Sequence, residues 1–555
     1  MKEYIEAAIA GVCKELFGVD VRVDLTRPDE QFGDFATNAA LQLAKQVNKN
    51  PREVAEQIAD HLKAQLGDKV AEVTIAGPGF INIKLSDSAL VELAETKPDK
   101  KYDGKQVVSE YSDPSAFKVL HAGHLYTSVV GDAISNLLEN AGGKVHRVNF
   151  GGDVGRHVAI TMYAILRDLG GEHPEKLAEI PDDQHADWMS ARYVEGNTAF
   201  EDDDQVKAEV TELNKRLYHL FTDNDHDSPF AQIYWTCRKW SYDYFDAFYA
   251  RIGSHFEKYY PESETAPIGL ATVKEQLAKG VYQESDGAVI FDGEKYGLHT
   301  RVFINSQGLP TYEAKDVGLI MKKWDDYHFD FSLILTDNAQ GDYMTVVLKS
   351  IEQFAPELAN ATKHLTHGRV KLAGGVKMSS RKGNIVRAVD VLDIAEEVYK
   401  STMGRDDEQA VLGAVKYAFL KQRLGADIIY DPKESVSLEG NSGPYVQYAH
   451  ARARSILTKA ETGDSKIENL GEGERSLLRK LSEYSDVIDK ATNEFMPHHI
   501  CTYLYELAQV FNRFYEKNRV IGDDRQAVRL QLVSRYADVL KNGLSLLGIS
   551  APDKM

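Results

Sequence analysis

The feature that most constrains the fold is a strand–helix–strand pattern between residues 106 and 149. Residues 106–111 and 144–149 have the length and side-chain pattern of buried strands. Between them, apolar side chains recur at the spacing of one helix face, and Gly142 and Gly143 mark the end of the helix. Two strands joined through a helix are parallel neighbours with a right-handed crossover. The pattern therefore predicts an α/β domain built on a parallel sheet.

The two ends of the chain have different periodicities. Residues 1–100 begin with helical spacing and then carry two β-rich runs around residues 77–79, whose Gly-Pro-Gly sequence is typical of a turn. This region predicts a small α+β domain with a hairpin. Residues 401–555 are almost entirely helical in pattern, which predicts a C-terminal helical bundle.

The middle of the chain, residues 101–400, contains the strand–helix–strand unit and further strand-like runs near its end. Within it, residues from about 156 to 290 are helical, acidic and aromatic. We interpret them as an insertion between two halves of the sheet domain. Closely spaced aromatic side chains between residues 234 and 249 are expected to be core residues and not a binding platform.

The composition indicates a soluble globular protein: 43% of the 555 residues are apolar and 27% are charged. No stretch approaches the roughly 18–20 uninterrupted apolar residues of a membrane span, and the N-terminus lacks a signal peptide's apolar stretch. Cys13, Cys237 and Cys501 are isolated, so they predict neither a disulfide framework nor a zinc site. We expect a cytoplasmic protein without a membrane partner.

The net charge of −20 argues, at first sight, against a nucleic-acid partner. The charge is uneven, however, because residues 405–555 hold nearly equal numbers of basic and acidic side chains. Acidic runs such as residues 201–204 are interpreted as solvated loops. An RNA partner is therefore not excluded, but it requires a local basic surface.

The first candidate site is His121-Ala122-Gly123-His124, at the junction of the first strand and the helix. Backbone N–H groups and the dipole at a helix N-terminus favour a bound anion. Histidines three apart share a face of the first turn, and Gly123 lets a ligand approach the backbone. The segment suits ATP, whose phosphate oxygens would accept from the histidines. The alternative is that both histidines only cap the helix.

A second candidate site is residues 377–384, which follow the pair Gly374 and Gly375 and combine positive charge with hydroxyl groups. Such a loop can close on a polyphosphate and neutralise leaving pyrophosphate. Alone it is equally compatible with a solvated basic turn. Both segments occur in order, more than 200 residues apart, on either side of a split α/β domain. That combination is more specific than either segment alone.

The two segments resemble the HIGH and KMSKS motifs of class I aminoacyl-tRNA synthetases. Their surroundings are similar to the arginine-specific family, the arginyl-tRNA synthetases, over residues 31–38, 77–82, 110–124, 151–155 and 443–452. The resemblance implies a Rossmann-type catalytic domain with a helical insertion. It also implies an N-terminal α+β domain that contacts the tRNA elbow around residues 33–38, and an all-α anticodon-binding bundle.

The resemblance implies a set of ATP ligands in the two motifs. They are His121, Gly123, His124, Lys377, Met378, Ser379, Ser380 and Lys382. Ser380 stands where the KMSKS motif has its second lysine, and Lys118 is the residue that the family comparison offers as a substitute. Mg²⁺ is expected to arrive with ATP, without metal ligands from the protein.

The resemblance also implies an arginine pocket. Tyr312 and Asp316, four apart on a predicted helix, would hold the guanidinium, with Glu110 nearby. Gln340 would contact the amino or carboxylate end of the substrate. Ser115 stands where the family usually has asparagine, and its shorter side chain predicts a weaker contact. Without the resemblance, Tyr312 and Asp316 would be interpreted as an ordinary pair on a helix surface.

For tRNA, aromatic and arginine side chains that stack on unpaired bases are the expected contacts. By the resemblance these are Tyr445, Tyr448 and Arg452, with Tyr515 and the terminal Met555 as weaker candidates. The alternative for each is helix packing.

The expected activity is that of an arginine–tRNA ligase. Arginine would react with ATP to give arginyl-adenylate, and the arginyl group would then pass to the 3′ end of tRNA(Arg). We expect a monomer. Two alternatives stay open from the sequence: an enzyme for another substrate, either a class I synthetase for another amino acid or a small nucleotidyltransferase, and a synthetase-like tRNA-binding protein that has lost catalysis.

Overall fold

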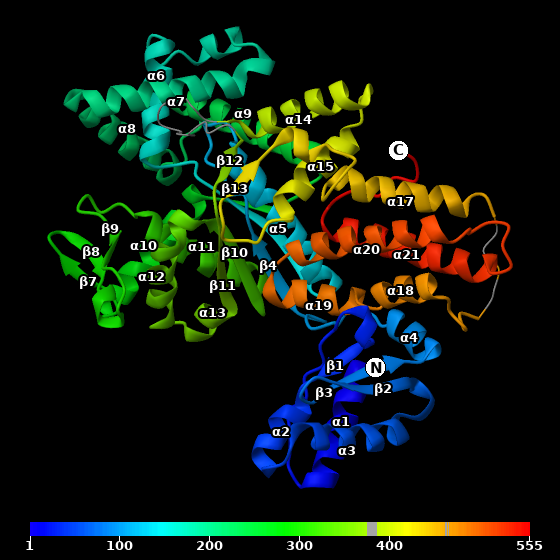
Figure 1. Cartoon of the computed structure of the whole chain (residues 1–555). Helices are drawn as coiled ribbons and strands as arrows, with labels where there is room; N and C mark the ends of the chain where they lie inside the picture. The colour runs from blue at the N-terminus through cyan, green and yellow to red at the C-terminus, as the bar shows by residue number, and fades with distance from the viewer. Residues whose placement is uncertain (374–385, 461–462, 464–465) are drawn as a thin grey trace.

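The computed structural model describes residues 1–373, 386–460, 463 and 466–555. Figure 1 shows an N-terminal domain below, the sheet-containing domain at the left and a helical bundle at the right. Predicted loop residues Lys377, Met378, Ser379, Ser380 and Lys382 lie outside the described residues.

The N-terminal domain packs helices on a small antiparallel sheet of order β1-β3-β2. Its elements are α1 (Lys2–Phe17), β1 (Phe35–Thr37), α2 (Ala39–Val47), α3 (Pro51–Leu66), β2 (Val70–Ala76), β3 (Phe80–Leu85) and α4 (Asp87–Ala94). Gly77 and Gly79 have φ angles of 54° and 144°, in the left-handed region that glycine adopts without strain. The predicted hairpin around residues 77–79 is thereby confirmed.

The described residues of the central domain form a five-stranded parallel sheet of order β11-β10-β4-β5-β6. Its strands are β4 (Gln106–Glu110), β5 (Lys144–Gly151), β6 (Lys258–Pro261), β10 (Phe331–Asp337) and β11 (Thr362–His367). Helix α5 (Ala122–Asn140) joins the parallel pair β4 and β5. The strand–helix–strand prediction is confirmed, with Gln106 facing Lys144 at the start of the register.

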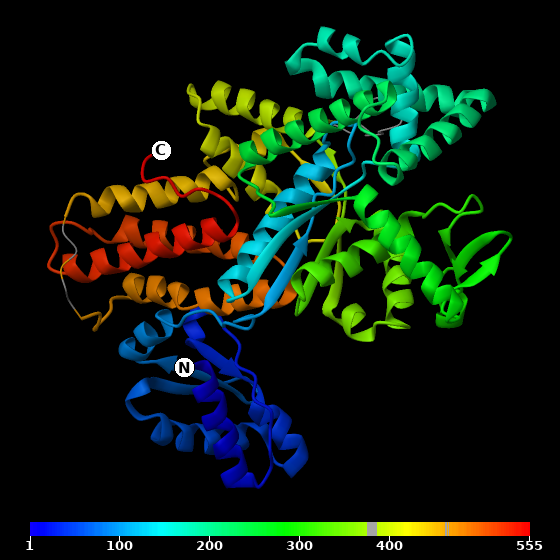
Figure 2. The ribbon, with the colours of Figure 1, turned by 180° about the vertical axis from the view of Figure 1, so that it is seen from behind.

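Both faces of this sheet are buried, as expected for a parallel sheet. Val107 of β4 belongs to the core that includes α5 and the C-terminal bundle. Its neighbour Val108 belongs to the core on the opposite face. The helices around that second core are α10 (Glu262–Ala278), α11 (Tyr312–Tyr327), α12 (Gly341–Glu352) and α13 (Pro356–Ala361). Figure 2 shows the sheet between these layers from behind.

The helical insertion forms a separate layer with its own core, at the top of Figure 1. Its helices are α6 (Arg156–Asp168), α7 (His185–Asp202), α8 (Asp204–Thr222) and α9 (Pro229–Ile252). Tyr234, Phe245, Phe248 and Tyr249 of α9 are buried, which confirms that the aromatic run is mainly core.

The predicted end of the insertion near residue 290 is wrong. Strand β6, inside that range, pairs with β5 in the main sheet. The strand-like run near residue 290 is β8 (Ala288–Phe291), which forms a separate antiparallel sheet with β7 (Gln283–Ser285) and β9 (Arg301–Ile304). A four-residue strand next to a long aromatic helix is too short to interrupt the helical pattern.

The C-terminal region is helical, as predicted. Its helices are α14 (Ala388–Met403), α15 (Glu408–Leu420), α16 (Pro432–Ser435), α17 (Gly443–Leu457), α18 (Glu472–Leu481), α19 (Tyr484–Glu494), α20 (His498–Lys517) and α21 (Gln526–Leu546). A short strand, β13 (Ile428–Tyr430), pairs in parallel with β12 (Val370–Leu372) and links this region to the central domain.

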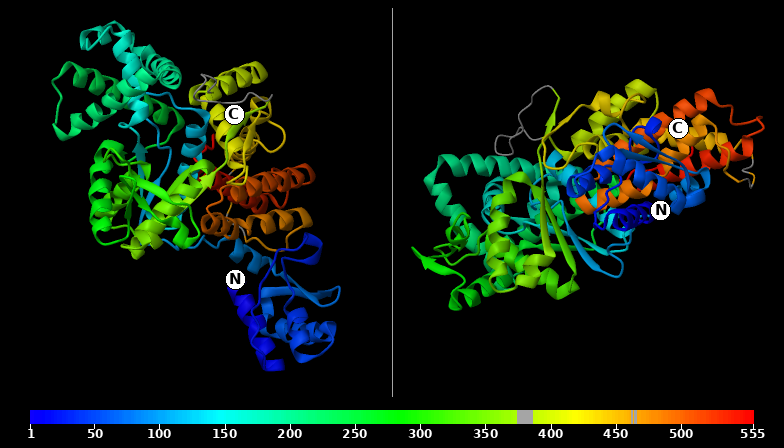
Figure 3. Two further views of the ribbon diagram at one scale, coloured as in Figure 1. Left: turned by 90° about the vertical axis from the view of Figure 1, so that its left-hand side faces the viewer. Right: turned by 60° about the horizontal axis from the view of Figure 1, so that its bottom comes forward.

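Ion pairs join the N-terminal domain to the bundle. The left-hand view in Figure 3 shows the N-terminal domain at the bottom, below the helices of the bundle. Arg475 of α18 donates to Asp34 at 2.6 Å and to Asp87 at 2.8 Å. Asp34 and Phe35 are 1% exposed. These two residues belong to the segment 33–38 that the resemblance placed at the tRNA elbow, and here they serve the domain interface and the core. An elbow contact must therefore come from exposed neighbours.

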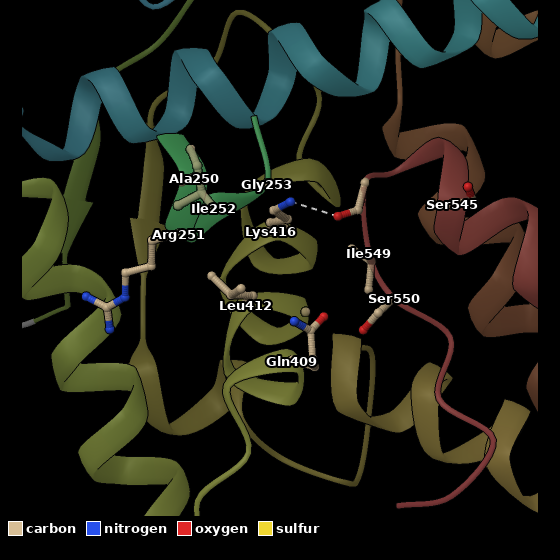
Figure 4. A pocket seen from close by; sticks show the side chains of 12 residues that line it. Ala250, Arg251, Ile252, Gly253, Gln409, Leu412, Lys416, Ser545, Ile549 and Ser550 are labelled. Atoms are coloured by element: carbon tan, nitrogen blue, oxygen red, sulfur yellow. Dashed lines mark hydrogen bonds between the residues drawn. The ribbon is translucent and has the colours of Figure 1, made fainter. Parts of the chain in front are cut away.

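The C-terminal segment after α21 is also tied down. A cavity of about 350 Å³ lies where the end of α9, helix α15 and this segment meet (Figure 4). Buried Lys416 donates to the carbonyl of Gly548 at 2.7 Å beside it. The segment after α21 is thus hydrogen-bonded to α15.

Candidate active site

Two stacked histidines form the N-terminus of α5. The Nδ1 atom of His121, the N-cap, accepts from the backbone N–H of Gly123 at 3.1 Å. The backbone N–H of His121 donates in turn to Nδ1 of His124 at 3.1 Å. Because both Nδ1 atoms accept, a neutral ring carries its proton on Nε2. Capping and anion binding are therefore compatible, since capping leaves each Nε2–H available to a ligand.

Burial holds both rings in the neutral form. It lowers the pKa of His121 to about 4, with the nearby Lys118 charge acting in the same direction. It lowers the pKa of His124 well below its usual value. The ring centroids lie 3.8 Å apart. A Cβ on Gly123 would lie 2.8 Å from the His121 ring, so this glycine is needed for the packing of the histidine itself.

Lys118 supplies the positive charge beside these neutral rings. Burial lowers the pKa of Lys118 to about 8, and the negative charge of Glu262 opposes that shift. The ammonium lies 4.2 Å from the centroid of the Tyr193 ring. Within the described ranges it has neither an ion pair nor a hydrogen-bond acceptor. A charged lysine without a carboxylate partner is suited to a phosphate.

Carboxylates gather on the other side of the site, at the carboxyl edge of the sheet. Glu110 ends β4, is 2% exposed and forms an ion pair with the fully buried Lys323 of α11. Asp316, also on α11, is 3% exposed and accepts from the hydroxyl of Tyr343. Burial raises the pKa of Asp316 to about 8, and the Tyr343 hydrogen bond opposes the shift. The structure thus brings the predicted residues Glu110 and Asp316 to one region.

Tyr312 and Asp316 do not form the surface pair that was the alternative. Tyr312 is 57% exposed at the start of α11, whereas Asp316 one turn later is buried. The Tyr312 ring faces the ammonium of Lys315, 5.1 Å from its centroid. An exposed aromatic ring one helical turn from a buried carboxylate is an arrangement that a guanidinium can use.

Asp113 is a further carboxylate that the sequence did not single out. Its φ angle is 47° and that of Ser112 is 77°, so the chain turns sharply after β4. Its Oδ1 atom accepts from the backbone N–H of Phe150 at 2.8 Å. Burial and the charge of Glu110 raise the pKa of Asp113 well above its usual value. An aspartate beside a proline is common in turns, and for that reason it carried no functional signal.

A second buried ion pair between a lysine and a glutamate lies next to Tyr312. Lys315 donates to Glu262 at 2.5 Å, and their side chains are 4% and 5% exposed. Glu262 begins α10, directly after β6, and the sequence prediction missed it because it placed this segment in the insertion. The pair neutralises itself, so it adds little net charge to the site.

Ser115 and Gln340 are less closely tied to the carboxylates. Ser115 pairs with Gly152 through a backbone bridge, and its Oγ atom and the ring of His157 both flank Gly152. His157, another residue that the sequence did not single out, donates from Nε2 to the Gly152 carbonyl at 3.2 Å. Gln340 is exposed at the start of α12. Its predicted contact with the substrate stays a prediction.

The segment after the second motif returns to the histidines. The backbone N–H of Ala122 donates to Val386 at 3.0 Å, and that of Ala388 donates to Leu120 at 2.8 Å. His121 and Arg387 form the bridge between these bonds. Residues 386–388, the first described residues after 385, are therefore hydrogen-bonded to the chain around His121.

The predicted anticodon residues cluster on α17 and α20. The Arg452 guanidinium lies 4.6 Å from the centroid of the Tyr515 ring. Asn512 donates to the Tyr445 hydroxyl at 3.0 Å and accepts from Arg452 at 3.4 Å. Tyr448 is 45% exposed. Met555 is half-buried against the bundle core, so packing accounts for part of its surface.

Three family models match this chain. The arginyl-tRNA synthetase N-terminal domain matches residues 1–85, the catalytic domain of class I (R) tRNA synthetases matches 87–431, and the DALR anticodon-binding domain matches 446–555. The catalytic match alone covers more than half of the chain. This chain belongs to the arginyl-tRNA synthetase family.

Relatives of full length agree with that assignment. An arginine–tRNA ligase of Porphyromonas gingivalis is 29% identical over 99% of both chains, and one of Frankia casuarinae is 31% identical over 99% of this chain and 97% of its own. The arginyl-tRNA synthetase of Thermus thermophilus has a TM-score of 0.81 and 25% identity over the whole of both chains. The predicted family and fold class are confirmed.

These matches leave the two alternative functions unfavoured. The catalytic-domain model is that of the arginine enzymes, not of another class I synthetase or of a separate nucleotidyltransferase. Among the described helices of this arginyl-tRNA synthetase family member, none is long and apolar enough to cross a membrane.

Proposed function

We propose that this arginyl-tRNA synthetase family member ligates L-arginine to tRNA(Arg) in two ATP-dependent steps at the site described above. The observation that carries the proposal is the segregation of charge. Lys118, which has no ion pair with a described residue, and two Nε2–H donors lie at the helix end, and the buried carboxylates Glu110 and Asp316 lie at the sheet edge. One side suits a triphosphate and the other a guanidinium.

In the first step the arginine carboxylate attacks the α-phosphorus of ATP in line, and pyrophosphate leaves. His121 and His124 donate from Nε2 to phosphate oxygens, and Lys118 balances the charge that develops there. Gly123 and the loop residues Lys377, Met378, Ser379, Ser380 and Lys382 complete the ATP ligands by the family resemblance. No side chain needs to act as a covalent nucleophile.

Mg²⁺ is proposed to enter with ATP. The donors at the helix end are N–H groups and an ammonium, which suit phosphate oxygens and not a hard cation. The metal would neutralise phosphate charge when bound.

Asp316 would receive the guanidinium, held in place by the Tyr343 hydroxyl. Asp113 would supply a second carboxylate, because Lys323 already occupies Glu110. The exposed ring of Tyr312 would cover the planar group. Gln340 and Ser115 would contact the amino and carboxylate end.

In the second step the terminal ribose hydroxyl of the tRNA attacks the carbonyl carbon of arginyl-adenylate. The ester bond forms, the acyl–phosphate bond breaks, and AMP leaves. Tyr445, Tyr448, Arg452, Tyr515 and Met555 would contact the anticodon, and the N-terminal domain would contact the tRNA elbow. We propose a cytoplasmic monomer. Within the chain, Arg475 of the bundle joins the N-terminal domain through Asp34, and Asn136 of α5 in the catalytic domain donates to the Leu546 carbonyl of α21 at 3.2 Å.

The test is ATP–pyrophosphate exchange with and without tRNA(Arg). We expect exchange that depends on arginine and is not supported by citrulline, which has the same shape without the charge. Absence of arginine-dependent exchange in both conditions would overturn the proposal, and equal exchange with citrulline would overturn the carboxylate pocket.

A further inference from the structure

We infer that helix α7 of the insertion positions the ATP side of the active site, with Tyr193 holding the Lys118 ammonium and Asp187 holding the segment that pairs with His121. This inference rests on the proposed function. It assigns a catalytic purpose to a helical insertion whose sequence showed only acidic and aromatic residues. Tyr193 and Asp187 are positioning residues, because they act through Lys118 and His121.

The Tyr193 contact explains how Lys118 can be buried and still available. Its ammonium lies over the ring, 4.2 Å from the centroid. A cation–π contact stabilises the charge through the ring face and covers only the side of the ammonium that faces the ring, which leaves N–H donors on the other side. The ammonium is therefore held in position while its N–H groups stay free to donate to phosphate oxygens.

The other buried lysines of the site are held in a different way. Lys315 pairs with Glu262 and Lys323 pairs with Glu110. A carboxylate at Lys118 would compete with the phosphate for the same N–H donors. The burial that lowers the pKa of Lys118 to about 8 makes a non-competing source of stabilisation important.

Asp187, six residues before Tyr193, makes the second contact from α7. It accepts from Nη1 of Arg387 with both carboxylate oxygens, at 2.8 and 2.9 Å. Arg387 is the bridge partner of His121, flanked by the backbone bonds of Ala122 and Ala388. A displacement of α7 would thus move the backbone that carries the first histidine.

Helix α7 is itself anchored on its insertion side. The ring of His185 stacks on Trp240 of α9 with centroids 3.5 Å apart. Arg192 pairs with Asp168 at the end of α6 at 3.0 Å. One rigid helix therefore reaches both Lys118 and the His121–Arg387 bridge.

The two contacts should differ in strength. The Asp187 and Arg387 side chains are 59% and 38% exposed, so solvent screens their attraction. The Tyr193 contact is at a desolvated cation, where a cation–π interaction is stronger. Tyr193 is therefore the primary target for substitution.

The experiment compares Tyr193→Leu with Tyr193→Phe. Leucine removes the ring and should raise the ATP KM roughly tenfold, whereas phenylalanine keeps the ring and should stay within about twofold of wild type. The arginine KM should not change in either variant. Phe200→Leu is the matched control, because it removes from the same helix an aromatic ring that lies against Arg156 and not against Lys118.

ATP–Mg²⁺ titration calorimetry of the full chain without arginine gives a second readout. Weaker ATP binding by Tyr193→Leu, with a wild-type melting temperature, supports the inference even if exchange with arginine were absent. An ATP affinity within about twofold of wild type would overturn it, as would equal losses in Tyr193→Phe or Phe200→Leu. Asp187→Asn should weaken ATP binding roughly two- to threefold, less at high salt.

Discussion

The candidate active site has two halves, the N-terminus of α5 and the carboxyl edge of the sheet, and they differ in how their buried charges are paired. At the helix end, Lys118 has no ion-paired carboxylate among the described residues, and two neutral histidines keep Nε2–H donors that the helix cap does not use. At the sheet edge, each buried lysine is already paired and carboxylates remain in excess. The difference supports the proposed placement of ATP at the helix end and of arginine at the sheet edge. We propose that the side with an unpaired lysine accepts an anion. The other side, where Asp113 and Asp316 have no ion-paired cation among the described residues, would accept a cation.

The largest expected effect comes from removing the cation-binding charge. Asp316→Asn keeps the shape of the side chain and should raise the arginine KM about 100-fold or more, because a buried charge pair is lost. ATP binding by calorimetry and the tRNA Kd should stay near wild type. Equal losses in arginine and tRNA affinity would contradict the assignment of Asp316 to the pocket.

Removing the unpaired cation should have the next largest effect, on the opposite ligand. Lys118→Met keeps the length and packing of the side chain, and kcat/KM for ATP should fall roughly 30-fold in the exchange reaction. The arginine KM should change little. A variant that loses arginine affinity as much as ATP affinity would show that the halves are not separate.

The pH dependence of kcat/KM should distinguish the arginine side of the site from the ATP side, with smaller effects than the substitutions above. Burial raises the pKa of Asp316 to about 8, so the ionised form that binds a guanidinium grows as pH rises toward 8. Burial lowers the pKa of Lys118 to about 8, so its charge is lost above that value. We expect kcat/KM for arginine to rise up to about tenfold per pH unit below 8, and kcat/KM for ATP to fall similarly above it.

Lys118→Arg is the control for the fall in activity above pH 8, because an arginine stays charged at this pH. The fall in kcat/KM for ATP should then disappear, and the rise for arginine should remain. If kcat/KM for arginine also lost its pH dependence in this variant, the same titrating group would control both pH profiles.

The smallest expected effect concerns Asp113. Asp113→Asn should raise the arginine KM roughly three- to tenfold, since Oδ1 still accepts from Phe150 and only the charge is removed. The preference for arginine over citrulline should be weaker in this variant than in the wild type. An unchanged arginine KM would limit the pocket to Asp316 and leave Asp113 as a turn residue.

Local patterns predicted much of the fold and one half of the site. The strand–helix–strand unit, the hairpin at residues 77–79 and the histidines at a helix N-terminus all depend on contacts within a few dozen residues, which leave a periodic or turn pattern. The boundary of the insertion failed because strand β6 is only four residues long. Asp113 was missed since a turn aspartate looks the same whether or not it faces a pocket.

By itself, the sequence determined the family, the order of the domains and the placement of His121 and His124 at the start of a helix. Tertiary structure alone decided which charges are already satisfied. Lys323 meets Glu110 across 213 residues, Lys315 meets Glu262 across 53, and Lys118 meets the ring of Tyr193 from the insertion. These contacts depend on how α7, α10 and α11 pack around the sheet edge. The spacing of residues along the chain does not predict that packing.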